Sequence, residues 1–157
     1  MDELLHLPYK AEVNDCWQIT RKYFALLGIE LTDYAFPSDF WDFEDSMYER
    51  LFEREGFFNV DTDGWKPTVN DVLMVPGNLK YNFPTHIGTL VDGNNILHHY
   101  SGRRSELTPF KGIWRTPSRV VRHKDLVQPP KTSNTLINIK ELMPDHVRRR
   151  IESSKPV

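Results

Sequence analysis

The sequence predicts an α+β domain in which helices come first and an antiparallel β-sheet follows. Apolar residues recur at helical spacing directly after Asp15, which indicates an amphipathic helix. Short apolar runs separated by turn residues begin after Trp65 and indicate strands. Helices and strands that occupy separate parts of a chain are typical of α+β proteins with an antiparallel sheet. We therefore expect an N-terminal helix packed on such a sheet.

The first helix is expected from about Cys16 to Leu27. Asp15 is a favourable N-cap residue, and Gly28 is suited to the backbone conformation with which many helices end. The spacing gives this helix one apolar face, formed by Cys16, Ile19, Tyr23, Leu26 and Leu27. Cys16 therefore stands in the first turn of a helix that has one side to bury.

A second, acidic amphipathic helix is indicated by Phe43, Met47 and Leu51, and it ends near Glu55. A loop containing Pro37 separates it from the first helix. Its acidic residues are more typical of a solvated helix face than of a binding site.

The strands are expected in the middle of the chain. Residues 72–75 form a short apolar run that a turn closes, which is typical of a buried strand. Residues 86–91 and 96–100 flank Asp-Gly-Asn-Asn at 92–95, which indicates a β-hairpin. A further strand is expected near residues 118–122.

The chain of 157 residues is long enough for one domain with a buried core. We expect this domain at residues 1–127, ended by Gln128-Pro129-Pro130. Residues 128–157 are then a C-terminal extension that docks on a partner or stays mobile. A helix is possible at 139–151, and its run Arg148-Arg149-Arg150 is more typical of a helix surface than of a nucleic-acid site.

The composition is that of a soluble globular protein, with 39% hydrophobic and 27% charged residues. No apolar run approaches the roughly 18 residues of a membrane span, and the first ten residues are too acidic for a secretory signal. A single cysteine excludes an internal disulfide, which agrees with folding in a reducing cytoplasm. These features argue against a membrane-spanning protein and against a disulfide-stabilised secreted one.

The charge is distributed unevenly along the chain. Residues 1–63 carry 15 acidic and 5 basic side chains, whereas residues 64–157 carry 7 and 15. Such asymmetry can mark a surface for nucleic acid or an anionic envelope, and it can equally reflect opposite charges that pair within one fold or with neighbours. Because no nucleic-acid motif accompanies the basic residues, we expect no nucleic-acid specificity.

Cys16 is the candidate nucleophile. The amides and the dipole at a helix N-terminus favour a negative charge, so this position is expected to lower the pKa of the thiol. The same amides could hold the oxyanion of a tetrahedral intermediate. The neighbouring carboxylate of Asp15 opposes thiolate formation unless it is occupied as the helix cap. The structural alternative is a small buried core residue.

A cysteine nucleophile needs a base, and the base needs a group that orients it. His86 opens the first hairpin strand and His98 lies in the returning strand. Side chains alternate between faces along a strand, so the hairpin loop decides which histidine lies beside His86. A four-residue loop would select His99, whereas a three-residue loop, a five-residue loop or a bulge would select His98. The residues alone leave both open.

A zinc site built from Cys16 and the three histidines is conceivable. The chain has no paired ligand spacing such as Cys-x-x-Cys, and the adjacent His98 and His99 would face opposite ways in a strand. We therefore predict no metal and no other cofactor.

These residues also carry a resemblance to a known family. The segment Asn14-Asp15-Cys16-Trp17 resembles the Asp-Cys signature of NlpC/P60 cysteine peptidases. Thr85-His86-Ile87-Gly88 and Asn95-Ile96-Leu97-His98 resemble the strand with the family's catalytic histidine and the next strand with its third catalytic residue. The family spacing favours His98 over His99.

The phage-tail branch of that family is more similar still, over about residues 8–126. The similar segments are the tryptophan after the cysteine, Leu27-Gly28-Ile29-Glu30-Leu31, Asn70-Asp71-Val72-Leu73, Ile113-Trp114-Arg115 and Val120-Val121-Arg122-His123. The resemblance implies a papain-like fold whose cysteine-bearing helix packs on the antiparallel sheet. It also implies a virion protein of the tail tip, made in the host cytoplasm, with other tail-tip or baseplate-hub proteins as partners.

The implied activity is that of a thiol protease, a hydrolase that cleaves peptidoglycan stem peptides and helps a bacteriophage pass the cell wall. Cys16 would attack, His86 would be the base and His98 would orient it. We assign substrate contacts to Tyr9 and Trp17, with core packing as the alternative. Family members usually carry a Gly-Gly segment after their tyrosine and a glycine two residues after the cysteine. This chain has neither, and Gln18 stands at the second position.

Two other functions fit the same residues. One is a catalytically silent structural protein of the tail tip that retains the peptidase fold, which the missing glycines and the C-terminal extension favour. The other is an unrelated papain-fold thiol enzyme, such as an amidase or acyltransferase acting on another amide.

Overall fold

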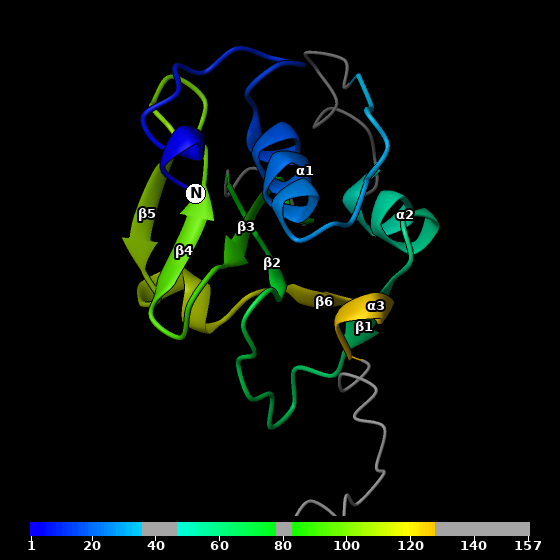
Figure 1. Cartoon of the computed structure of the whole chain (residues 1–157). Coiled ribbons are helices and arrows are strands. Elements are labelled where there is room, and N and C mark those ends of the chain that lie inside the picture. Colours follow the sequence, from blue (N-terminus) through cyan, green and yellow to red (C-terminus); the bar gives the residue numbers. More distant parts are fainter. Residues whose placement is uncertain (36–46, 78–82, 128–157) are drawn as a thin grey trace, which may run out of the picture. The chain divides into compact units, whose positions relative to one another are not determined.

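The computed structural model describes residues 1–35, 47–77 and 83–127. Within them the chain is mixed α and β, with few helices and one antiparallel sheet (Figure 1). The helices are η1 (Asp2–Leu4), α1 (Cys16–Leu26), α2 (Met47–Arg54), η3 (Gly112–Arg115) and α3 (Lys124–Val127). The strands are β1 (Phe57–Val60), β2 (Val72–Val75), β3 (His86–Leu90), β4 (Asn95–His98), β5 (Glu106–Pro109) and β6 (Arg119–His123).

Helix α1 begins and ends where the sequence predicts it. The Asp15 carboxylate accepts hydrogen bonds from the backbone N–H of Gln18 and of Glu12, each at 2.9 Å. It thereby satisfies a helix N–H that has no partner within the helix. Gly28 adopts a φ of +79° just beyond the last turn, a conformation in which a Cβ atom would be strained. The cap places Cys16 at the first helical position.

The sheet has the strand order β1-β6-β2-β3-β4-β5, and every neighbouring pair is antiparallel. Every residue of β2 and β3 is buried, because these strands are central and both faces of the sheet are covered. The predicted strand at 72–75, the hairpin and the strand near 118–122 are therefore confirmed. Strands β1 and β5, at the two edges, were not predicted.

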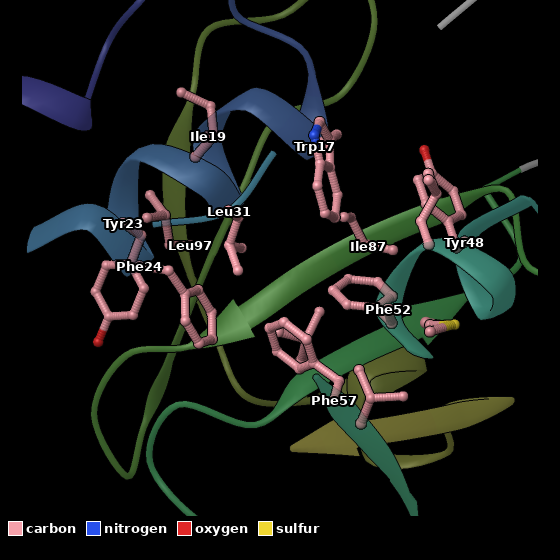
Figure 2. Close-up of a cluster of buried hydrophobic side chains, with 14 of the residues drawn as sticks. Trp17, Ile19, Tyr23, Phe24, Leu31, Tyr48, Phe52, Phe57, Ile87 and Leu97 are labelled. Atoms are coloured by element: carbon pink, nitrogen blue, oxygen red, sulfur yellow. The ribbon is translucent and has the colours of Figure 1, made fainter. Parts of the chain in front are cut away.

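One core cluster lies between the sheet and the helices. Trp17 of α1 and Phe52 of α2 converge over Ile87 of β3, with ring centroids of the two aromatics 5.5 Å apart (Figure 2). Helix α1 contacts β3 and β4, and α2 contacts β1. The expected packing of the cysteine-bearing helix on the sheet is thus observed.

A second cluster covers the opposite face. It is built on Leu73 and Val75 of β2 and closed by Trp114 of η3. Because side chains alternate along β3, His86, Gly88 and Leu90 lie on this face of the sheet, whereas Ile87 lies on the face that α1 covers.

The α+β class with an antiparallel sheet is confirmed, and the papain-like NlpC/P60 fold stays a prediction. Phe43 of the second predicted helix, the possible helix at 139–151 and the whole extension at 128–157 lie outside the described residues. In the part of the chain that the structure describes, no helix has the length and apolarity needed to cross a membrane.

Candidate functional site

Cys16 is held at the point where α1 meets the start of β3. Its Sγ lies 3.0 Å from the hydroxyl oxygen of Tyr48 on α2. The backbone amides of Ile87 and Trp17 also interact with the sulfur and lower the pKa of the thiol. A hydroxyl and two backbone amides from three elements thus lie around one sulfur atom, and all three can stabilise a thiolate once it forms.

The thiol is nevertheless protonated at neutral pH. Burial raises the pKa of Cys16 to about 11, against the lowering by the Tyr48 hydrogen bond, and the Asp15 charge raises it further. The residue as a whole remains partly exposed. The pKa lowering expected from the helix N-terminus is therefore wrong, because desolvation of the thiolate outweighs the donors around it.

Three tyrosines respond to the charge of Cys16, and one of them, Tyr48, contacts its sulfur. Burial is the main cause that raises the pKa of Tyr9, Tyr48 and Tyr100, and the negative charge of a Cys16 thiolate raises each of them further. Tyr48 is the most deeply placed, with 1% of its surface exposed. The phenol of Tyr48 is therefore neutral, and it can donate a hydrogen bond to a thiolate at Cys16.

The two hairpin histidines form a buried pair. His86 Nε2 lies 3.3 Å from His98 Nδ1, and both residues are almost completely buried. The ring of Tyr100 stacks on His86 with centroids 3.9 Å apart, and Trp114 lies beside both imidazoles. These contacts hold the two rings in one orientation.

Both histidines are neutral at pH 7. Burial lowers the pKa of His86 well below its ordinary value, and the charges of His98 and His99 lower it further. Burial also lowers the pKa of His98 to about 4, although the carboxylate of Glu106 acts in the opposite direction. A neutral imidazole pair can pass a proton but holds no fixed positive charge.

The hairpin register decides between His98 and His99. Leu90 pairs with Ile96 and Gly88 pairs with His98, so five residues separate the first paired positions. His98 therefore shares the face of His86. His99 points to the other side, where its Nε2 contacts the carbonyl oxygen of Arg103 at 3.1 Å and its ring meets Tyr9 edge-on.

Cys16 and His86 are brought to the same end of β3 without being hydrogen bonded. The amide that contacts the sulfur belongs to Ile87, one residue from the imidazole. Among residues 1–35, 47–77 and 83–127 no hydrogen bond joins the side chains of Cys16 and His86. In this state the thiol is paired with Tyr48 instead.

The two residues assigned to substrate contacts occupy different surroundings. Tyr9 is partly exposed beside His99 and so remains available to a bound molecule. The side chain of Trp17 has no exposed surface, and it packs against Tyr34 and Phe52 in the core. Trp17 therefore packs in the core next to the helical turn that carries Cys16. This placement agrees with core packing, the alternative to a substrate contact.

Sequence reasoning missed Tyr48, Tyr100 and Glu106. Tyr48 lies on a second helix whose register against Cys16 depends on the fold, so no spacing in the sequence points to it. The sequence indicates only weakly that Tyr100 and Glu106 lie near the site, because both are close in sequence to His98. Strand β5, which contains Glu106, pairs with β4.

Two further features of the described residues bear on ligand binding. No group of three or more His, Cys, Asp or Glu side chains is placed to bind a metal ion within the described ranges. An open hollow of about 410 Å³ lies at the far edge of the sheet, lined by Asn59, Val60, Asp61, Thr62 and Arg119. It includes none of the residues around Cys16.

The fold and the site define a mixed α and β protein with a lone cysteine at a helix N-terminus and a buried histidine pair that begins on the adjoining strand, β3. No family model matches the chain. It is 32% identical over 128 residues to tail tip assembly protein K of Escherichia phage N15, covering 78% of this chain and 50% of that protein. It is 26% identical over 113 residues to tail tip assembly protein K of Escherichia phage lambda, covering 71% and 55%.

The chain is thus similar to phage proteins named for tail tip assembly, and it spans about half the length of the curated relatives it matches. The phage-tail part of the resemblance drawn from sequence agrees with these likenesses. The NlpC/P60 part stays a prediction.

Proposed function

We propose that this chain is a structural and assembly component of a phage tail tip, located in the virion and built on a peptidase-like domain. The similarity to two tail tip assembly proteins K carries the proposal. The site supports it, because the Cys16 thiol is protonated and is hydrogen bonded to Tyr48 instead of His86. Such a contact serves packing and does not activate the thiol. Its partners are other tail-tip proteins.

The test is complementation of a phage that lacks this gene with the wild-type chain, Cys16→Ala or His86→Gln. Particles are counted by electron microscopy and infectivity by plaque number. We expect the deletion to abolish complete tails and both variants to restore tails and plaques. Normal infectious particles from the deletion would overturn the assembly role. Variants that restore tails but not plaques would show that chemistry at Cys16 serves infection.

The second candidate is a thiol peptidase acting on peptidoglycan stem peptides, and the donor-lined Cys16 beside the His86–His98 pair favours it. In this mechanism the thiol proton passes to His86 as the sulfur attacks an amide carbonyl. The tetrahedral intermediate then expels the amine, which takes the proton from His86. Water hydrolyses the remaining thioester, releases the acid and regenerates the thiol.

The resting pKa gives this candidate a sharp test. With a pKa of about 11, about one thiol in a thousand is ionised at pH 8, against roughly a quarter for an ordinary thiol. We expect iodoacetamide to label Cys16 at least a hundredfold more slowly than free cysteine, on the order of that thiolate ratio. Tyr48→Phe should slow it further, since loss of the hydrogen bond raises the pKa.

Fast labelling at pH 6 that collapses in His86→Ala would contradict the resting geometry and would favour the peptidase. Digestion of purified cell wall then identifies the reaction. New stem-peptide fragments in the chromatogram indicate the peptidase, whereas free glycan strands with intact stems indicate an amidase.

A further inference from the structure

The contact between His86 and His98 does not by itself show which of the two facing ring nitrogens carries the proton. The two ring nitrogens are 3.3 Å apart, and both rings are neutral at pH 7. One nitrogen must donate and the other must accept, so two arrangements of tautomers are available. They differ in what the far side of each imidazole can do.

In the first arrangement His86 Nε2–H donates to His98 Nδ1. His86 Nδ1 then carries a lone pair and can accept a proton, while His98 carries its own proton on Nε2. In the second arrangement His98 Nδ1–H donates to His86 Nε2. His86 Nδ1 is then protonated and cannot act as a base, and His98 Nε2 is a bare lone pair.

Glu106 stands on the far side of this pair. Strand β5 sets Glu106 directly opposite His98 in the antiparallel register, and its Oε1 lies 4.0 Å from His98 Nε2. That nitrogen is buried and has no hydrogen-bond partner in the described part of the chain. A small side-chain rotation or one water molecule closes a gap of this size.

A carboxylate only accepts hydrogen bonds, so it attracts an N–H at Nε2 and repels a lone pair there. Arg103 Nη1 lies 3.5 Å from the same Oε1 and competes for it, but the Arg103 side chain is 68% exposed and its attraction is screened by water. The buried His98 nitrogen therefore gains more from the carboxylate than Arg103 does.

We propose that Glu106 is a positioning residue that fixes His98 as the Nε2–H tautomer and, through it, His86 as the Nε2–H tautomer with a free Nδ1. The relay runs from the edge strand β5 through β4 to β3, the strand whose Ile87 amide interacts with the sulfur of Cys16. Its catalytic consequence rests on the thiol chemistry proposed above as the second candidate. The tautomers themselves do not depend on that chemistry.

The test is ¹⁵N NMR of histidine-labelled full-length protein at pH 7.5, where the shifts of the two ring nitrogens identify each tautomer. We compare wild type with Glu106→Leu, which removes the carboxylate, and Glu106→Asp, which keeps it. Glu53→Gln is the matched control, because Glu53 is exposed and lies on α2 away from the pair. His86→Gln and His98→Gln variants assign the signals.

We expect Nε2–H for both histidines in wild type and Glu53→Gln, loss of that preference in Glu106→Leu, and its recovery in Glu106→Asp. Iodoacetamide labelling of Cys16 should slow in Glu106→Leu if His86 is its base, because part of the His86 population then carries its proton on Nδ1 and cannot accept another there. His98 protonated on Nδ1 in wild type, or tautomers unchanged in Glu106→Leu, would overturn the proposal.

The two proposals fail separately. Tautomers that follow Glu106 while His86→Ala leaves Cys16 labelling unchanged would keep the relay and reject the thiol base. If labelling depends on His86 but not on Glu106, and the tautomers are the same in Glu106→Leu, the thiol base is kept and the relay is rejected.

Discussion

At Gly88 the absence of a side chain lets Trp114 lie directly against β3. A Cβ atom at this position would come within 2.5 Å of Ile96 Cγ2 and 2.7 Å of Trp114 Cη2. Trp114 also packs beside the rings of His86 and His98. One glycine thus permits the close packing that orients the histidine pair.

Gly88→Ala should therefore destabilise the protein by about 1–3 kcal/mol, the usual cost of overpacking a filled core. Guanidinium unfolding followed by tryptophan fluorescence measures the change. Gly93→Ala is the control, because a Cβ there meets nothing within 4 Å and φ is not positive. Equal stability of the two variants would show that Trp114 moves aside at no cost.

Cys16 shows what sequence reasoning can and cannot provide at this scale. Its position in the first helical turn followed from Asp15 and the periodicity behind it, both of which are local signals. Its raised pKa did not, because burial of the thiol depends on α2 and β3 packing around it. The approach of Tyr48 is likewise a tertiary contact that no spacing predicts.

At the scale of elements, the carboxylate of Asp15 both caps helix α1 and influences the pKa of Cys16. Asp15 caps the helix through Gln18 N–H, and it also accepts from Glu12 N–H in the preceding turn. Its negative charge meanwhile raises the pKa of Cys16. The cap needs an acceptor oxygen, whereas the effect on the thiol needs the charge, so the two can be separated.

Asp15→Ala should cost about 1–2 kcal/mol of stability, because the capping acceptor is lost. Asp15→Asn keeps one acceptor oxygen for Gln18 N–H but turns its NH2 group toward Glu12 N–H, so it should destabilise the protein less than Asp15→Ala does, while lowering the pKa of Cys16. Chemical unfolding measures the first effect, and the pH profile of iodoacetamide labelling measures the second. An unchanged profile in Asp15→Asn would show that the charge does not reach the sulfur.

The elements that sequence reasoning found are those with strong local signals: a capped helix, an apolar run and an Asp-Gly hairpin. The edge strands β1 and β5 were missed for physical reasons. β1 follows α2 after a two-residue turn, so its start carries no separate breaker cluster. β5 alternates between half-buried and exposed residues and ends at Pro109, a residue that favours an edge and weakens a strand prediction.

Across the whole molecule, the sheet separates two apolar clusters, and the histidine pair lies in the one that Trp114 closes. A core that contains neutral imidazoles is sensitive to acid, because the unfolded chain can protonate them freely. His98 illustrates the size of the effect. Its pKa of about 4 against an ordinary 6.5 corresponds to about 3 kcal/mol between the two protonation states.

The sign follows from the direction of the shift. The folded-state pKa of His98 is lowered, so its contribution to stability is complete above pH 6.5 and is lost as pH falls toward 4. His86 acts in the same direction. Burial dominates both shifts, while Glu106 opposes the shift of His98, and His99 and Arg103 reinforce it.

We therefore expect the free energy of unfolding to fall between pH 7 and pH 4.5, and to fall less steeply in His98→Gln than in wild type. Guanidinium titrations at each pH give the two slopes, and the difference between them removes the contribution of the carboxylates common to both proteins. His6→Asn is the control, since His6 is exposed and asparagine tolerates its φ of +62°. Parallel curves for wild type and His98→Gln would mean that His98 has nearly the same pKa in the folded and the unfolded protein. The pair at the start of β3 would then be open enough to exchange protons with a bound molecule, and the resting geometry would be one of several that the hairpin adopts.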